Sequence, residues 1–379
     1  MLRGMDRWLP GYFLGRVRRA CARVRVRPRH VLLCVADHFE PLNRDIAPDG
    51  SISGGIAPVD ARGAVADWCR AYQARLGALR DVDGCPPRHT FFYPWDEYDA
   101  ACVDALAAFC RAGFGEVEIH LHHRHDDVDG VRRKLVECRD TFAQRHGLLG
   151  RHADGRPGYA FVHGNWALCD SRPDGDWCGV RRELAVLAET GCYADLTFPS
   201  APSPTQPRTL NAPFYGRDPE ARERGVQRAG WVTADGASAT APRGVMMIPG
   251  PLGLNWRRRK WGVLPRLENA ELSGANPPTA DRLRVWLRVG VSVAGRADWV
   301  VVKLHTHGMA PANRVLLLGE SMAAFHRTLG EWCRGSGACD LHYVTARELH
   351  NILKAAEAGR DGNPGKYRDY GVGAPAWTD

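Results

Sequence analysis

Histidines concentrate at the ends of two apolar stretches of the chain, where they could bind a metal ion. The first cluster follows residues 117–119 and the second follows residues 299–304. The clusters consist of His120, His122, His123 and His125, and of His305 and His307. Neutral imidazole nitrogens are ligands of zinc and other first-row metal ions. The two clusters predict one cavity that is lined by these side chains and binds a metal ion. The alternative is that both clusters lie in solvated loops.

The two apolar stretches have the length and composition of buried strands, whose side chains alternate between faces. Glu118 therefore shares a face with His120 and His122, and Lys303 shares a face with His305. Burying ionisable groups is costly unless they pair or bind metal. We therefore expect the two polar faces to line one cavity, in which Lys303 pairs with Glu118.

Asp37 and His38 follow another apolar strand and offer a carboxylate beside an imidazole. Together they could supply two ligands of one divalent ion, or one ligand and one base; the alternative is a helix cap or turn. We expect Asp37 to be the general base and His305 to protonate the leaving group. An Asp with several His favours zinc, or else nickel or cobalt, and such an ion activates water and polarises a carbonyl. The expected metal ligands are His38, His120, His122 and His125.

A fourth apolar strand ends in polar and aromatic residues that suit a substrate. His163 and Asn165 share one face, and Gly164 between them allows a ligand to approach the backbone closely. Tryptophan rings near the strand ends suit sugar rings, although they could equally serve packing. The expected substrate-binding residues are His163, Asn165, Trp166 and His307.

Apolar strands alternate with amphipathic helices along the chain. The predicted strands are 30–36, 88–93, 117–121, 158–163, 192–198, 245–248, 299–305 and 341–344, and the predicted helices are 59–79, 98–112, 131–145, 181–190, 314–334 and 346–358. This order predicts the α/β class, either a distorted (β/α) barrel or a doubly wound sheet. Polar residues at strand carboxyl ends favour the barrel, whose active site lies there.

The organisation predicts a single catalytic domain at residues 30–358. Within it, residues 199–298 are rich in Pro and Gly and are expected to form long loops over the carboxyl-terminal face of the barrel. Residues 359–379 are expected to form an extended tail.

The net charge of +8 has a local origin. Residues 1–29 carry nine arginines and one acid, and they also include the aromatic residues Trp8 and Tyr12. This leader predicts peripheral contact with an anionic membrane surface, and the alternative is a solvated basic tail. Nucleic-acid binding would suit the charge, but no recognisable binding module accompanies it.

The cysteine pattern points to a reducing compartment. The twelve cysteines are scattered and none forms a CxxC pair. They predict buried free thiols and no zinc knuckle. We therefore expect a cytoplasmic protein, at the inner face of the membrane if the leader makes contact there.

The chain resembles the polysaccharide deacetylases of the NodB-homology type over much of residues 30–355. Their first motif falls on Asp37-His38, which implies that Asp37 is the base and that His38 replaces a metal-binding Asp. Their second motif, a His pair, falls on the cluster from His120 to His125, where no pair has the family's spacing. Their third motif falls near His163–Trp166 and is replaced. Their last motif matches Leu304-His305 and implies that His305 is the leaving-group acid.

This resemblance implies a distorted barrel that uses a divalent metal to remove acetyl groups from an N-acetylated sugar or polysaccharide precursor. Two other functions stay open. One is a metal-dependent phosphoesterase or amidohydrolase barrel that binds more than one ion. The other is a non-catalytic barrel that binds glycans. The absence of a GxSxG motif counts against a serine hydrolase.

Overall fold

The computed structural model describes residues 8–13, 15, 28–47, 49, 51–234, 244–335 and 339–377. Most of the basic leader predicted at residues 1–29 lies outside the described residues. Trp8 and Tyr12 are described, and both are buried in a small cluster with Ala201 and Leu252. Two aromatic side chains of the leader therefore pack against the protein itself.

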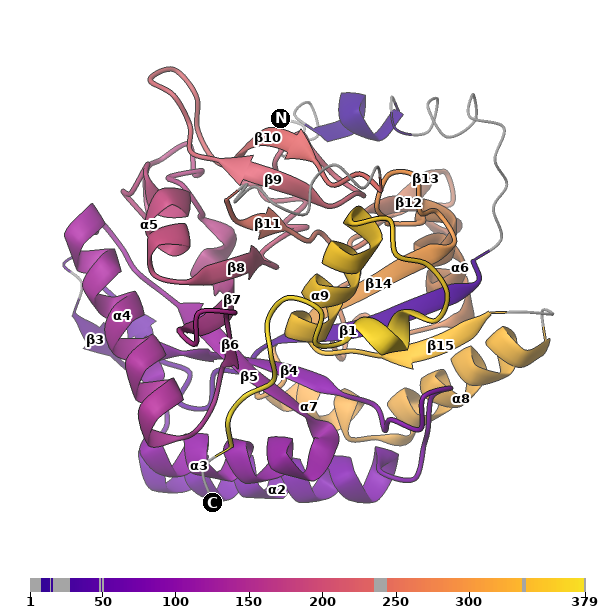
Figure 1. Ribbon diagram of the computed structural model, residues 1–379, viewed down its shortest axis with the longest axis horizontal. Helices are drawn as coiled ribbons and strands as arrows, with labels where there is room; N and C mark the ends of the chain where they lie inside the picture. Colours follow the sequence, from indigo (N-terminus) through magenta and orange to yellow (C-terminus); the bar gives the residue numbers. More distant parts are fainter. Residues whose placement is uncertain are drawn as a thin grey trace.

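A large, mostly parallel sheet forms the centre of the protein, in agreement with the predicted α/β class (Figure 1). Its path of hydrogen-bonded strands runs β10-β9-β11-β8-β7-β5-β4-β1-β14, while β15 pairs with β1 and β6 pairs with β7. The strands of this sheet are β1 (His30–His38), β4 (His89–Pro94), β5 (Gly115–Leu121), β6 (Gly150–Arg151), β7 (Pro157–His163), β8 (Cys192–Asp195), β9 (Phe214–Arg217), β10 (Gln227–Trp231), β11 (Met246–Met247), β14 (Trp299–Thr306) and β15 (Asp340–Tyr343).

Helices cover both faces of this sheet, so its strands are buried on both sides and read as nearly continuous apolar runs. The helices are α2 (Pro58–Leu76), α3 (Ala100–Phe109), α4 (Val128–Arg145), α5 (Glu183–Glu189), α6 (Ala280–Val289), α7 (Pro311–Leu317), α8 (Glu320–Gly335) and α9 (Ala346–Glu357). Side chains of α2, α3 and α4 belong to the same hydrophobic cluster as Val31 and Leu33 of β1, whereas those of α9 share a second cluster with Leu32 and Cys34 on the other face. Figure 1 shows α9 on the opposite side of β1 from α2 and α3.

Residues 199–298 contain regular elements as well as the loops predicted there. Strands β9, β10 and β11 extend the central sheet beyond β8. Two strands, β12 (Gly253–Lys260) and β13 (Leu264–Glu268), form a separate antiparallel hairpin. A second short hairpin, β2 (Asp45–Ile46) with β3 (Ile52–Ser53), follows β1.

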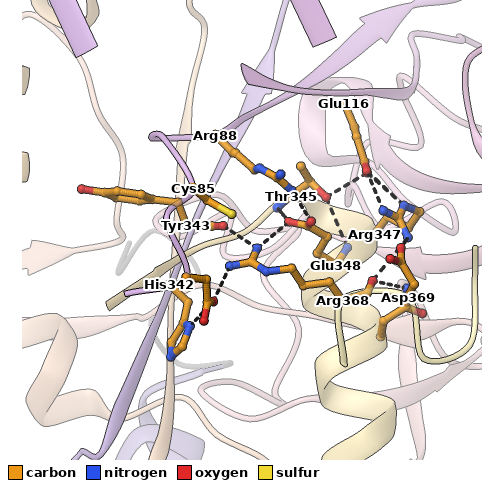
Figure 2. A network of polar contacts seen from close by, with 12 residues as sticks. Cys85, Arg88, Glu116, His342, Tyr343, Thr345, Arg347, Glu348, Arg368 and Asp369 are labelled. Atoms are coloured by element: carbon orange, nitrogen blue, oxygen red, sulfur yellow. Dashed lines mark hydrogen bonds and ion pairs between the residues drawn. The ribbon is translucent and has the colours of Figure 1, made fainter. Parts of the chain in front are cut away.

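A buried polar network holds α9 against the sheet (Figure 2). The helix begins at a capping box in which Thr345 and Glu348 satisfy each other's backbone N–H groups. Arg347 donates to Glu116 of β5 at 2.8 Å, and Thr345 Oγ1 donates to the same carboxylate at 2.8 Å. Arg88 pairs with Glu348 from the segment before β4. The first turn of α9 is therefore fixed to β5 and to the segment that precedes β4.

The segment after α9, which was predicted to form an extended tail, is bound to the same network. Arg368 donates to Glu348 at 2.9 Å, and Asp369 accepts from Arg347 at 2.6 Å. Val372 is buried. These contacts tie the described part of the segment to α9, as Figure 2 shows.

The cysteines that the structure describes are free thiols, and all except Cys85 are buried, as predicted. Across the described residues, no helix combines the length and the apolar character needed to cross a bilayer.

Candidate metal centre and active site

The carboxyl ends of β1, β5 and β14 bring the predicted polar residues together. The register aligns Asp37 of β1 with Thr306 of β14, and His38 with Phe92 of β4. It also aligns Pro94 of β4 with His120 of β5. Side chains that follow these strands therefore meet at one edge of the parallel sheet, where α/β proteins place their ligands.

His38, Glu40 and His120 form the centre of this region. One ligand atom from each lies within 4.8 Å of the others, a spacing that could hold a metal ion. The rings of His38 and His120 are 4.9 Å apart, and both side chains are buried. Glu40 is only partly buried, with 18% of its side chain exposed, so the cluster is reached from one side.

The hydrogen bonding of His120 leaves one of its nitrogens free to bind a cation. Nδ1 lies 2.7 Å from the carbonyl oxygen of Val162, which can only accept, so Nδ1 carries the hydrogen. In the neutral imidazole Nε2 is then an acceptor, and it lies 3.3 Å from the carboxylate Oε1 of Glu40. Two acceptors face each other, an arrangement that a cation between them would stabilise.

Two further histidines surround Glu40. His122 Nε2 lies 3.4 Å from Oε1 of Glu40, and His307 Nδ1 lies 3.3 Å from Oε2. On its other side, His122 places Nδ1 3.1 Å from Asp96 Oδ2, and its backbone N–H donates to Oδ1 of Asp96 at 3.1 Å. Asp96 thus orients the His122 ring toward Glu40.

The charges of these groups favour an ionised Glu40 beside a neutral His38. Burial and the neighbouring His307 and His120 lower the pKa of His38 well below its usual value. Burial would raise the pKa of Glu40, but contacts with His122 and His307 lower it well below its usual value. For His122, burial opposes protonation, yet Asp96 raises its pKa well above the usual range.

A cavity of about 200 Å³ opens on the cluster. Its lining consists of His38, Glu40, Asn43, Arg44, Asp45, Ile46, His122, Asn165, Trp166, Trp177 and His307. Asn165 and Trp166 adopt the left-handed region, with φ of 54° at each, a conformation that places both side chains on the cavity wall. The Arg124 guanidinium lies 4.5 Å from the centre of the Trp177 ring and holds it by a cation–π contact.

Asp37, the predicted base, lies behind the cavity instead of on its wall. Its side chain is fully buried, accepts from the Gly308 N–H at 2.5 Å and lies 2.7 Å from Nε2 of His89. A Cβ atom at Gly308 would lie 1.9 Å from Oδ2 of Asp37, so only glycine fits there. Asp37 therefore fixes the turn that carries His307.

His305, the predicted acid, is also buried and is not among the residues that line the cavity. Burial and the charge of Lys303 lower the pKa of His305 well below its usual value. The Lys303–Glu118 pair that the strand faces suggested does not form. Lys303 donates to the carbonyl oxygens of Leu196 and Phe198 at 2.5 Å and 2.7 Å, because it reaches across to the end of β8. Glu118 instead accepts from Tyr193 and from the backbone N–H of Ala160.

Two other predicted site residues lie away from the cavity. The His125 side chain is 52% exposed on the loop before α4, 3.4 Å from Asp176. His163 is fully buried in a different cluster, with His123, Cys178 and Glu183. The alternation of faces explains this separation, since His163 lies on the same face of β7 as Phe161, whereas the Val162 side chain belongs to the cluster on the other face.

Sequence reasoning missed Glu40 and Asp96. Glu40 follows His38 by two positions, so the periodicity of an extended chain places both on one face. Asp96 stands two residues beyond the end of β4, at the same edge of the sheet. Both residues could have been predicted as site residues, because each is a carboxylate that follows shortly after a buried strand.

No protein-family model matches the chain, and no curated protein matches it in sequence. Among solved structures, the chain is similar to a "putative glycoside hydrolase/deacetylase" from Parabacteroides distasonis. The identity is 13% and the TM-score 0.35, over 84% of this chain and 69% of the other.

Proposed function

We propose that the protein is a metal-dependent hydrolase that removes the N-acetyl group from a sugar or polysaccharide precursor. The observation that carries this proposal is the contact between His120 and Glu40. A buried imidazole whose Nδ1–H is committed to Val162 turns an acceptor nitrogen toward a carboxylate at 3.3 Å. Metal-binding histidines characteristically donate their second nitrogen to a carbonyl or carboxylate in this way.

His38, Glu40 and His120 are the proposed ligands. Two His and one Glu form a known ligand set for catalytic zinc, which leaves a coordination position open. This donor set suits zinc, with nickel and cobalt as alternatives. Such an ion supplies Lewis-acid chemistry, because it activates water and polarises a carbonyl oxygen.

His122 is the proposed proton carrier. Asp96 binds its Nδ1 side, so Nε2 is the atom that faces the cavity and exchanges a proton there. In amide hydrolysis, water adds to the acetyl carbon, the C–N bond breaks, and the amine leaves with a proton. His122 and His307 both lie beside Glu40 and are placed to hold or deliver that proton. Asp37 and His305 become positioning residues in this proposal.

The cavity size favours a small reacting group. A volume of about 200 Å³ is below the roughly 300–1,000 Å³ of pockets that enclose drug-sized ligands. An acetyl group with part of one sugar ring fits this space, and the rest of a longer substrate would lie outside. Trp166 and Trp177 on the wall offer flat apolar surfaces for the ring.

We also infer that the central sheet forms a distorted (β/α) barrel of the NodB-homology type. The convergence of polar side chains at strand carboxyl ends supports this inference, as does the place of His38 in the family's first motif. The free buried thiols support a reducing compartment, which for this chain would be the cytoplasm.

A phosphoesterase is the second candidate, because Arg44 lines the cavity. An arginine beside a metal cluster suits a phosphoryl oxygen. To separate the two, the protein loaded with zinc and the chelated protein are assayed on N-acetylated oligosaccharides and on a phosphodiester. The proposal predicts acetate release that depends on metal and no phosphate release. Metal-dependent phosphodiester cleavage without acetate release would replace it with the second candidate.

A further inference from the structure

We propose that His123, His163, Cys178 and Glu183 form a second metal site, which binds a zinc-class ion and holds the wall of the active-site cavity in place. One ligand atom from each of the four residues lies within 4.8 Å of the others. All four are buried. A closed set of four protein ligands is characteristic of structural zinc sites, whereas the cluster at Glu40 is open to a cavity.

His163 presents an acceptor nitrogen to this cluster. Its Nδ1 atom contacts the carbonyl oxygen of Gly164, which can only accept, so Nδ1 carries the hydrogen. Nε2 is a buried nitrogen without a hydrogen-bond partner, and it lies 3.2 Å from the carboxylate Oε1 of Glu183. The arrangement resembles the one at His120 and Glu40, where a ring nitrogen also lies beside a carboxylate.

Cys178 has the surroundings of a metal-bound thiolate. Its Sγ atom accepts backbone N–H groups from Asp170 and Val180, each at 3.3 Å. Hydrogen bonds to a ligand sulfur are among the contacts by which proteins tune metal centres. The same Sγ donates to Oε2 of Glu183 at 3.3 Å, a contact that a cation shared by the thiolate and the carboxylate would replace.

The four ligands come from separate parts of the chain. His123 follows β5, His163 ends β7, Cys178 lies in the long loop after β7, and Glu183 begins α5. A cation at their centre would fasten this loop to two strands of the central sheet. That role differs from the zinc knuckle excluded by the absence of a CxxC pair, since only one thiol takes part.

The loop has a backbone conformation that such an anchor would stabilise. Five of its non-glycine residues adopt the left-handed region, namely Asn165, Trp166, Cys169, Asp170 and Trp177. Left-handed backbone costs energy for residues other than glycine and persists only where the surroundings impose it. Three of the five line the cavity: Asn165, Trp166 and Trp177. The second site therefore positions the substrate wall of the first.

Metal analysis of the purified full chain tests this proposal. Wild type is expected to retain about two zinc ions per chain after dialysis, and Cys178→Ser and Glu183→Gln about one. Cys169→Ser is the matched control: Cys169 is a buried thiol in the same loop, but its Sγ contacts Asp218 and lies outside the four-residue cluster. This variant should retain the wild-type metal content.

Cobalt substitution gives a second readout that needs no activity, and its wild-type measurement does not depend on the folding of any variant. Cobalt(II) bound to a thiolate produces a sulfur-to-metal charge-transfer band in the near ultraviolet. The proposal predicts this band in wild type, in Cys169→Ser and in Glu40→Gln, which alters only the first cluster, and its loss in Cys178→Ser. A wild-type cobalt protein without the band would overturn the proposal, as would an unchanged metal content in Cys178→Ser and Glu183→Gln. Neither result would bear on the site at Glu40.

Discussion

His122 and His123 are consecutive residues whose side chains enter two separate clusters. Nε2 of His122 lies 3.4 Å from the carboxylate of Glu40, and Nε2 of His123 lies 3.0 Å from that of Glu183. Extended backbone sends neighbouring side chains to opposite faces. One of these neighbouring side chains thus contacts the open cluster, which consists of His38, Glu40 and His120 and faces the cavity. The other joins the closed cluster, which consists of His123, His163, Cys178 and Glu183.

Asp96 orients His122, so its removal should lower activity without loss of metal. Asp96→Asn keeps the shape of the side chain but weakens its contact with Nδ1 of His122. Substitution of such a supporting partner typically costs 10–100-fold. We expect kcat to fall by about this factor while metal content stays at the wild-type value. Unchanged kcat in Asp96→Asn would exclude His122 as the proton carrier that Asp96 positions.

Trp177 should contribute to substrate binding more than to chemistry. Its ring lies on the cavity wall and is held by Arg124. We expect Trp177→Ala to raise KM for an N-acetylated oligosaccharide by about tenfold with little change in kcat. This pattern is typical of an interaction that stabilises the bound substrate and the transition state equally. Trp177→Phe, which keeps an aromatic face, should stay near wild type. Equal losses in both variants would argue against sugar stacking.

Glu118 should make stability depend on pH. Burial raises its pKa to about 8 from a usual value of 4.5. Between these values the folded chain holds a proton that the unfolded chain has released, so the free energy of unfolding should fall as pH rises through this window. One proton corresponds to a slope of up to about 1.4 kcal/mol per pH unit.

Urea unfolding at several pH values, from about 5 to about 8, measures this slope. Glu118→Gln has no ionisable group at this position and keeps an amide oxygen that can accept from the Ala160 N–H, so it should flatten the dependence. Glu137→Gln, at an exposed position, should keep the wild-type slope. Equal slopes in wild type and Glu118→Gln would show that Glu118 does not carry the effect.

Arg347 should contribute strongly to the free energy of unfolding. Its guanidinium pairs with buried Glu116 at 2.8 Å and also binds Asp369. Removal of one partner of a buried pair typically costs about 3–5 kcal/mol, because the other charge stays buried alone. We expect Arg347→Met to lose about this much in urea unfolding, and Arg347→Met/Glu116→Leu to recover part of it. A loss below about 1 kcal/mol, the range of surface pairs, would contradict the buried-network account.

The strands that carry the open cluster were predictable because they are buried on both faces. Strands such as β1 and β14 appear in the sequence as nearly continuous apolar runs, and the polar residues at their carboxyl ends stand out. Periodicity also placed His38, His120 and His122 near one another. Periodicity does not predict which carboxylate contacts these histidines, since this depends on how the chain turns after β1 and β4.

The closed cluster was not predictable by the same reasoning. His123 and Glu183 are 60 positions apart, and Cys178 lies in a loop without periodicity. Only the packing of α5 against the sheet brings them together. The prediction of a Lys303–Glu118 pair was wrong for a related reason. A shared interior face does not fix the direction of a long side chain, and Lys303 instead donates to carbonyl groups after β8.

Isothermal titration of zinc into chelated protein tests the central claim most directly. Wild type should bind an ion that is lost in Glu40→Gln, together with acetate release from an N-acetylated oligosaccharide. Asp45→Asn, which changes an exposed acid on the same cavity wall, should keep both. Zinc affinity and acetate release that are the same in Glu40→Gln as in wild type would contradict a metal centre at His38, Glu40 and His120.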